Sequence, residues 1–115
     1  MKVLIVDDEE DVRDSLQELF ADEGFEVETA PDGAAALRQL NEEETLPCVV
    51  ILDLLMPVLG GDDLYRKMQS DPRLATIPVI VSTSDPARAP GGLLIMKKPI
   101  NLDRLLGAVR RFCAQ

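Results

Sequence analysis

Five short apolar segments recur along this chain, and stretches with helical periodicity separate them. Residues 2–6, 48–52, 78–82 and 93–96 are almost entirely apolar, as is typical of parallel strands that are covered on both faces. Residues 25–30 instead alternate, with glutamates on one face, which favours an edge strand. The alternation of strand and helix predicts a doubly wound α/β fold with a parallel sheet and helices on both faces.

The helical stretches each carry an apolar stripe. Three of these stretches have a polar residue that can cap the helix at its start. These residues are Asp32 for the second helix, Asp62 or Asp63 for the third, and Asn101 for the last. The first stripe stops at Gly24, a residue suited to the end of a helix. Residues 83–92 contain two prolines and two glycines, so the fourth helix of the series should be shortened or missing.

Composition restricts the class of protein. A length of 115 residues and a net charge of −9 indicate one acidic globular domain. Residues 1–63 carry −15 and residues 64–115 carry +6, which disfavours direct nucleic-acid binding by the first half. No apolar run is long enough for a signal peptide or a membrane span, so we expect a cytoplasmic protein without membrane contact. Cys48 and Cys113 are expected to be reduced and buried.

Polar residues lie where four of the predicted strands end. Asp7 and Asp8 follow the first strand, Asp53 follows the third, Thr83 closes the fourth and Lys98 follows the fifth. In a parallel sheet these ends share one edge, where ligands bind. Individually, these residues have simpler explanations: Asp7 or Asp8 as a helix cap, Asp53 as a loop acid, Thr83 as an ordinary strand residue and Lys98 as a solvated charge.

Taken together, these residues indicate phosphoryl chemistry. Three carboxylates that converge repel one another unless a cation intervenes, and oxygen ligands suit Mg²⁺, whereas the absence of histidine argues against zinc. Asp53 is then the candidate nucleophile toward phosphorus, and Lys98 and Thr83 would hold the phosphoryl oxygens from the other side.

The motifs KVLIVDDEEDVRDSL, VVILDLLMP, PVIVST and KKP, in this order and spacing, make the whole chain resemble the receiver domain of bacterial two-component response regulators. The resemblance implies a flavodoxin-like sheet of order 2-1-3-4-5. It also implies Asp53 as phosphoacceptor, Thr83 as the switch residue and Lys98 as the family's lysine. Mg²⁺ would bind Asp7, Asp8, Asp53 and the backbone carbonyl of Leu55, and the Lys98–Pro99 peptide bond would be cis.

The same resemblance implies a signalling partner at each end of the reaction. A sensor histidine kinase or a phosphotransfer protein would donate the phosphoryl group. Thr83 would then move inward, and the face formed by the fourth helix, the fifth strand and the fifth helix would change shape for a downstream protein partner. The chain would be a phosphoacceptor signalling protein, assisting its own phosphoryl transfer and dephosphorylation, rather than an enzyme. We expect residues 1–115 to form a single receiver domain with no output domain.

The sequence departs from the family pattern at several positions. Ile95 replaces the rotating aromatic residue, and Thr83 and Lys98 are only 15 positions apart. Leu55 replaces a side chain that is often polar in relatives, which predicts altered autodephosphorylation, and Gly60 and Gly61 replace a common Asp-Gly pair.

Two rival interpretations of the whole chain remain open, together with one question about its basic surface. One is a phosphorylation-independent adaptor, in which the acidic site survives but the switch is uncoupled. Another is a flavodoxin-like cofactor binder, which the acidic loop after the first strand disfavours because it would repel phosphate. Arg104, Arg110 and Arg111 form either a docking patch for a partner or a solvated face.

Overall fold

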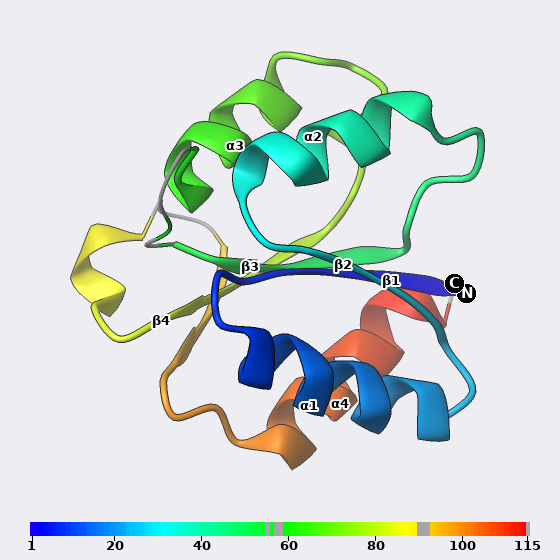
Figure 1. Cartoon of the computed structure of the whole chain (residues 1–115), viewed down its shortest axis with the longest axis vertical. Coiled ribbons are helices and arrows are strands. Elements are labelled where there is room, and N and C mark those ends of the chain that lie inside the picture. Colours follow the sequence, from blue (N-terminus) through cyan, green and yellow to red (C-terminus); the bar gives the residue numbers. More distant parts are fainter. Residues whose placement is uncertain (55, 57–58, 90–92, 115) are drawn as a thin grey trace.

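The computed structural model describes residues 1–54, 56, 59–89 and 93–114. Its centre is a parallel five-stranded sheet of order β2-β1-β3-β4-β5 (Figure 1). The strands are β1 (Lys2–Val6), β2 (Glu26–Ala30), β3 (Val49–Asp53), β4 (Val79–Thr83) and β5 (Leu94–Lys97). The fold class and strand order expected from the sequence are confirmed.

The strands lie close to their predicted positions, but four of them begin one residue later than the apolar segments indicated. Asp53 is the last residue of β3 rather than a residue that follows it, and Thr83 closes β4 as expected. Asp53 is in register with Ser82. The hydrogen-bonded pairing of the strands includes these polar residues because backbone hydrogen bonds do not require an apolar side chain. Asp53 and Thr83 are therefore held in place by the hydrogen bonds of the sheet.

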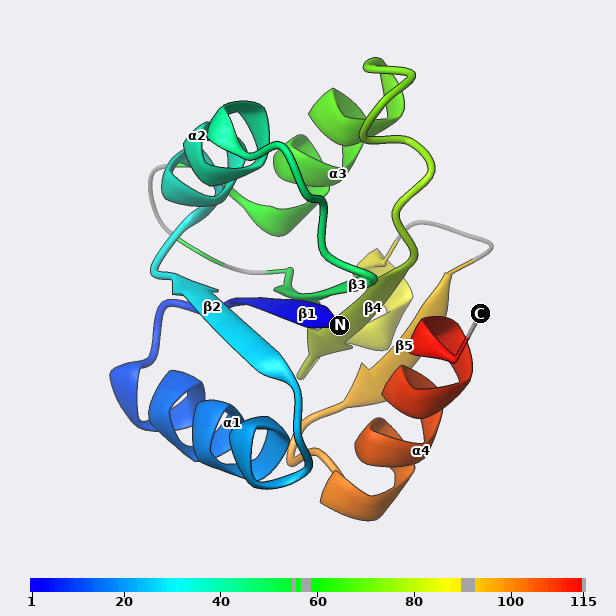
Figure 2. The same cartoon turned by 90° about the vertical axis from the view of Figure 1, so that its right-hand side faces the viewer.

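Helices cover both faces of the sheet (Figures 1 and 2). Helices α1 (Glu10–Asp22) and α4 (Leu102–Cys113) lie on one face, and α2 (Gly33–Glu42) and α3 (Gly61–Gln69) lie on the other. Each face has its own apolar core, because alternate residues of the buried strands point to opposite sides. In the described part of the chain, no helix is long and apolar enough to cross a bilayer.

Side chains cap two of the helices as expected. Asp32 accepts a hydrogen bond from the Ala35 amide at 2.8 Å, and Asn101 accepts one from the Arg104 amide at 3.1 Å. The expected cap of α3 by Asp62 or Asp63 is wrong, because the helix begins at Gly61 with Gly60 as its cap residue. A Cβ atom on Gly61 would lie 2.3 Å from the Asp53 carbonyl oxygen, so this helix start must lie close against the end of β3.

The connection between β4 and β5 contains only one turn of 3₁₀ helix, Pro86–Arg88, within the residues that the structure describes. The expectation of a shortened fourth helix is therefore confirmed, and the proline and glycine content of this segment accounts for it. The label α4 consequently belongs to the C-terminal helix, which follows β5 directly.

The expectation that both cysteines are reduced is wrong. Cys48, just before β3, and Cys113, the last residue of α4, form a disulfide with their Cα atoms 5.2 Å apart. Their separation of 65 positions gave no sign of this proximity, which arises because α4 runs back along the sheet to the amino end of β3. The fold thus joins its C-terminal helix covalently to a central strand.

Candidate functional site

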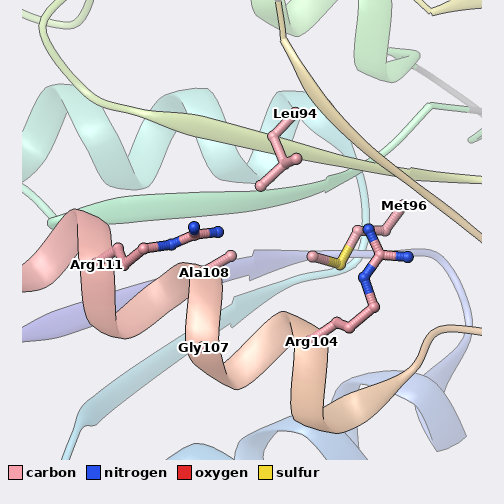
Figure 3. Close-up of a pocket in the computed structure, with 6 residues that line it drawn as sticks. All are labelled: Leu94, Met96, Arg104, Gly107, Ala108 and Arg111. Atoms are coloured by element: carbon pink, nitrogen blue, oxygen red, sulfur yellow. The ribbon is translucent and has the colours of Figure 1, made fainter.

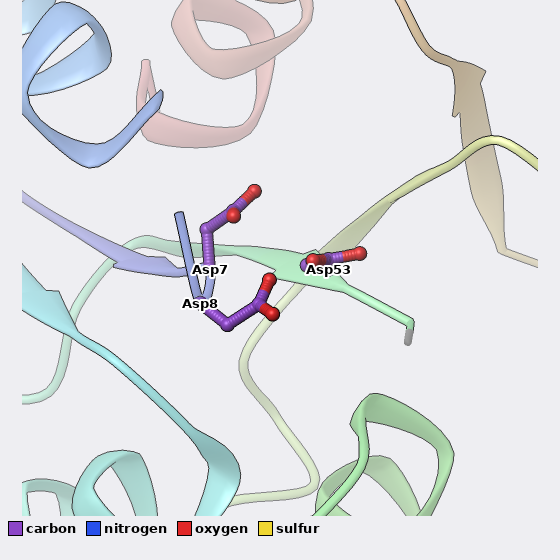
Figure 4. Close-up of side chains that lie close together, drawn as sticks. All are labelled: Asp7, Asp8 and Asp53. Carbon is purple, nitrogen blue, oxygen red and sulfur yellow. The ribbon is translucent and has the colours of Figure 1, made fainter. Parts of the chain in front are cut away.

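Three aspartates meet at the carboxyl edge of the sheet (Figure 4). Asp7 follows β1 directly, Asp8 comes next, and Asp53 ends the neighbouring strand β3. One carboxylate oxygen from each of the three lies within 4.8 Å of the others. The adjacency of β1 and β3 in the sheet brings together residues that are 46 positions apart in the sequence.

The ammonium of Lys98 lies beside two of these carboxylates. Its Nζ atom is 3.3 Å from Asp7 Oδ2 and 3.4 Å from Asp53 Oδ2. Burial lowers the pKa of Lys98, but the charges of Asp7 and Asp53 outweigh this effect and raise the pKa above its ordinary value. Lys98 is therefore fully protonated at neutral pH and offsets part of the negative charge.

The three aspartates differ in their surroundings. Asp7 and Asp53 are buried, at 3% and 4% exposure, whereas Asp8 is exposed. Asp7 also accepts a hydrogen bond from the Glu9 amide through Oδ1 at 2.9 Å. Asp7 and Asp53 are thus held in place by the protein, while Asp8 faces solvent at the mouth of the site.

Thr83 is connected to this group through the backbone of Lys98. Its carbonyl oxygen accepts a 2.9 Å hydrogen bond from the Lys98 amide, and its Oγ1 atom accepts one from the Asp85 amide at 3.1 Å. The side chain is buried at the end of β4. The Lys98–Pro99 peptide bond is cis, as the resemblance implied, and Leu55 lies outside the described residues.

Two neighbours of the site were not singled out from the sequence. Glu9 Oε1 is 3.8 Å from Lys98 Nζ, and Arg13 donates a 2.7 Å hydrogen bond from Nη1 to the Asp7 carbonyl oxygen. Glu9 belongs to the acidic run after β1, so proximity in sequence could have indicated it. Arg13 had no such signal, because its contact depends on how α1 turns back toward β1.

The donor set suits one kind of cation. Three carboxylates and one ammonium leave excess negative charge in a partly buried place, and all the available ligand atoms are oxygens. Mg²⁺ prefers one or two carboxylates together with water and phosphate oxygens. The residues therefore fit a magnesium ion.

Comparisons with known proteins agree with this geometry. The family described as "Response regulator receiver domain" matches residues 3–110. A protein of Leptolyngbya boryana, named as an uncharacterized 14.6 kDa protein, is 32% identical over 98% of this chain and 90% of its own length. The transcriptional regulatory protein PrrA of Mycobacterium leprae is 42% identical over 73% of this chain, which spans only 36% of that relative.

Solved structures share the fold. The response regulator TrrA of Thermotoga maritima, solved in complex with Mg²⁺ and BeF, superposes with a TM-score of 0.83 at 26% identity. The alignment covers 96% of this chain and 97% of TrrA. The likeness therefore extends over the complete sheet and its helices.

Proposed function

The chain belongs to the response regulator receiver domain family, and from this membership we propose that it accepts a phosphoryl group on Asp53 in a Mg²⁺-dependent reaction. The observation that carries the proposal is the convergence of Asp7, Asp8, Asp53 and Lys98 at one edge of the sheet. Residues 1–115 would act as one receiver domain in the cytoplasm, with no direct contact to nucleic acid or membrane.

Each residue of the site has a distinct proposed role. Asp7, Asp8, Asp53 and the Leu55 carbonyl would hold Mg²⁺, which supplies positive charge against the phosphoryl oxygens. A carboxylate oxygen of Asp53 forms the new bond to phosphorus while the bond to the donor's leaving group breaks. Lys98 stabilises the charge of the transferred group, and the Thr83 hydroxyl would hold one of its oxygens.

The position of Lys98 supports this assignment. Its ammonium already contacts the Asp53 carboxylate at 3.4 Å, so it is close enough to reach an oxygen of a phosphoryl group attached to Asp53. The related TrrA is described in complex with Mg²⁺ and BeF, which supports a magnesium requirement here. The donor would be a sensor histidine kinase or a phosphotransfer protein, and a downstream protein would read the change. Hydrolysis of the aspartyl phosphate would be assisted by the same residues.

Intact-mass spectrometry tests the proposal directly. The protein is incubated with acetyl phosphate and Mg²⁺, and we expect the addition of one phosphoryl group. Asp53→Asn and a metal-free sample should show none. Asp14→Asn is the matched control, because Asp14 is an exposed acid of α1 away from the site. Addition to Asp53→Asn, or no addition to the wild type even with a phosphorylated kinase as donor, would refute the assignment.

One observation favours a second candidate function, a phosphorylation-independent adaptor. The segment between β4 and β5 has only a three-residue 3₁₀ turn among its described residues, and Ile95 stands where the family has its rotating aromatic residue. Both features remove parts that couple Asp53 to the output face. Equal binding of a partner to the wild type and to Asp53→Asn would favour the adaptor, whereas binding only to the phosphorylated wild type would exclude it.

A further inference from the structure

Strand β4 ends in two neighbouring hydroxyls, Ser82 and Thr83, and only Thr83 has a role in the proposed reaction. Ser82 is 2% exposed, and its Oγ atom is buried. Among the residues that the structure describes, this atom has no hydrogen-bond partner, whereas Thr83 Oγ1 accepts one from the Asp85 amide. A buried hydroxyl without a partner costs stability, and most such groups in folded proteins are hydrogen-bonded. Ser82 therefore has a bonding capacity that the unphosphorylated protein does not use.

Ser82 lies beside Asp53 on the same face of the sheet. The two residues are register partners in the parallel pairing of β3 with β4, and the Ser82 carbonyl oxygen accepts a 3.3 Å hydrogen bond from the Leu54 amide. Side chains of a strand alternate between the two faces. Ile51 and Ile80, which lie two residues before Asp53 and Ser82, both belong to the core under α1 and α4. The side chains of Asp53 and Ser82 are therefore neighbours on the side of the sheet that α1 and α4 cover.

The side chain of Lys98 crosses the end of β4 on this face. Lys98 follows β5, whereas its ammonium lies 3.4 Å from Asp53 Oδ2 on β3 and 3.3 Å from Asp7 Oδ2 beyond β1. Because β4 lies between β5 and β3 in the sheet, the aliphatic part of Lys98 passes over β4. Met96, two residues before Lys98, is the register partner of Ser82 and faces α4 (Figure 3). The hydroxyl of Ser82 therefore lies beside the path of the Lys98 side chain.

Phosphorylation of Asp53 changes what the Lys98 ammonium contacts. An ammonium has three N–H donors, and in the unphosphorylated protein it faces the carboxylates of Asp7, Asp53 and Glu9 at 3.3, 3.4 and 3.8 Å. All three distances exceed the roughly 2.7–2.9 Å of a strong charge-assisted hydrogen bond. When the bond to phosphorus forms, the negative charge moves from the Asp53 carboxylate to the phosphoryl oxygens. An N–H donor that faced the carboxylate then loses its charged acceptor, and the Ser82 oxygen is the acceptor beside it.

We propose that Ser82 is a positioning residue for Lys98: its Oγ atom accepts a hydrogen bond from the ammonium when Asp53 carries a phosphoryl group. The ammonium is then held by Asp7, the phosphoryl group and Ser82 together. The unpartnered hydroxyl costs stability in the unphosphorylated protein and stabilises the phosphorylated one, so removing it should affect the two states in opposite directions. The role of Ser82 rests on the proposed phosphoryl transfer to Asp53 and adds a residue to it.

Two measurements on Ser82→Ala separate this role from a structural one. In metal-free buffer, the midpoint of urea unfolding should equal or exceed that of the wild type, because the variant removes a buried hydroxyl without a partner. In Mg²⁺ buffer, beryllofluoride is the mimic of the phosphoryl group, and the rise in melting temperature with its concentration gives an apparent Kd. We expect this Kd to increase about tenfold, the factor for one hydrogen bond from a charged group. A residue needed only for packing would instead lower the midpoint of the unbound protein.

Ser82→Thr and Ser82→Val form a matched pair, because the two new side chains have nearly the same shape and only threonine has a hydroxyl. Ser82→Thr should bind beryllofluoride about tenfold more tightly than Ser82→Val. Nitrogen NMR detects an ammonium whose exchange with water is slowed by hydrogen bonds. With beryllofluoride bound, the Lys98 signal should appear in the wild type and Ser82→Thr and be absent from Ser82→Ala and Ser82→Val. The control Ser15→Ala removes an exposed hydroxyl from α1 and should match the wild type.

Three results would overturn the role of Ser82: wild-type affinity for beryllofluoride in Ser82→Ala, equal affinities in Ser82→Thr and Ser82→Val, or a lowered unfolding midpoint of unbound Ser82→Ala. Intact-mass measurement after incubation with acetyl phosphate accompanies each sample. If the wild type is phosphorylated on Asp53 and Ser82→Ala behaves identically, only the role of Ser82 fails. A wild type that neither accepts a phosphoryl group nor binds beryllofluoride would refute the proposed function and the role of Ser82 with it.

Discussion

At the scale of single residues, Asp7 and Asp8 are neighbours in sequence but have different energetic roles. Asp7 is buried and pairs with Lys98, so its charge is compensated within the protein. Asp8 is exposed, yet its carboxylate still lies within 4.8 Å of ligand atoms of Asp7 and Asp53. Without a cation, Asp8 therefore contributes repulsion and little stability.

Asp8→Asn should change how the protein responds to Mg²⁺. In metal-free buffer we expect the variant to be as stable as the wild type or slightly more stable, because one of three like charges is removed. With Mg²⁺ the wild type gains stability by ligand binding, and if the substitution weakens binding tenfold, the gain falls by about 1.4 kcal/mol. Urea unfolding with and without Mg²⁺ measures both effects. An equal gain in the two proteins would show that Asp8 is not a ligand.

At the scale of secondary-structure elements, α2 begins with a side-chain cap that can be tested. The Asp32 carboxylate accepts the Ala35 amide at 2.8 Å and satisfies one of the unpaired donors at the helix start. Asp32→Ala should lower the free energy of unfolding by about 1 kcal/mol. Asp32→Asn keeps the acceptor and should lose much less. Thermal or urea unfolding of both variants decides the matter, and equal losses would contradict the capping role.

A cluster of charges joins β1, β2 and the end of α2 at the opposite end of the sheet from the aspartates. Lys2 Nζ lies 2.9 Å from Glu28 Oε1 and 2.6 Å from Glu43 Oε2. A hydrogen bond shared with Glu43, together with the charge of Lys2, lowers the pKa of Glu28. Burial and the proximity of Glu28 raise the pKa of Glu43. The fold therefore favours an ionised Glu28 and disfavours an ionised Glu43.

These opposite shifts predict opposite pH dependences. Because the pKa of Glu28 is lowered from 4.5, its contribution to stability is complete above that value and is lost as the pH falls through the lower, folded-state pKa. Glu28→Gln should therefore be destabilising at pH 7 and progressively less so below 4.5. Glu43→Gln resembles the favoured neutral form and should cost less at pH 7. Urea unfolding from pH 7 to pH 3 tests this, and equal costs for the two variants at pH 7 would contradict it.

The sequence was informative about elements because periodicity and turn residues are local signals. The apolar segments placed all five strands to within one residue, and the prolines and glycines of residues 83–92 indicated the shortened helix. Strand order then brought Asp7, Asp8, Asp53 and Lys98 together. The start of α3 was missed because it depends on a close approach between Gly61 and the end of β3. The disulfide and the Arg13 contact depend likewise on tertiary packing.

At the scale of the whole molecule, the disulfide and the acidic site occupy opposite ends of the sheet. Cys48 precedes the first residue of β3, whereas Asp53 is its last residue. A strand of five residues spans roughly 17 Å, so the two features are separated by the length of β3. The disulfide closes a loop of 65 positions and thereby restricts the unfolded chain. It should contribute to stability without taking part in the chemistry of Asp53.

Reduction should therefore separate stability from phosphoryl chemistry. The chain-entropy relation gives about 4 kcal/mol for a loop of this length, and measured values for disulfides are typically about 2–4 kcal/mol. We expect a reductant to lower the unfolding free energy by this amount while the rate of phosphorylation by acetyl phosphate is unchanged. The protein should remain folded, because a reduced Cys113 stays buried as a small apolar residue. This matters for the proposed role in the cytoplasm, where thiols are usually kept reduced.

The control for this experiment is Cys48→Ala, which cannot form the bond and should not respond to the reductant. Alkylation followed by mass measurement counts the free thiols in each sample and verifies that the wild type is oxidised before treatment. A wild type whose stability does not change on reduction would contradict the contribution of the disulfide. A phosphorylation rate that falls on reduction, in protein that remains folded, would instead show that the anchoring of α4 reaches Lys98 through the segment that joins β5 to this helix.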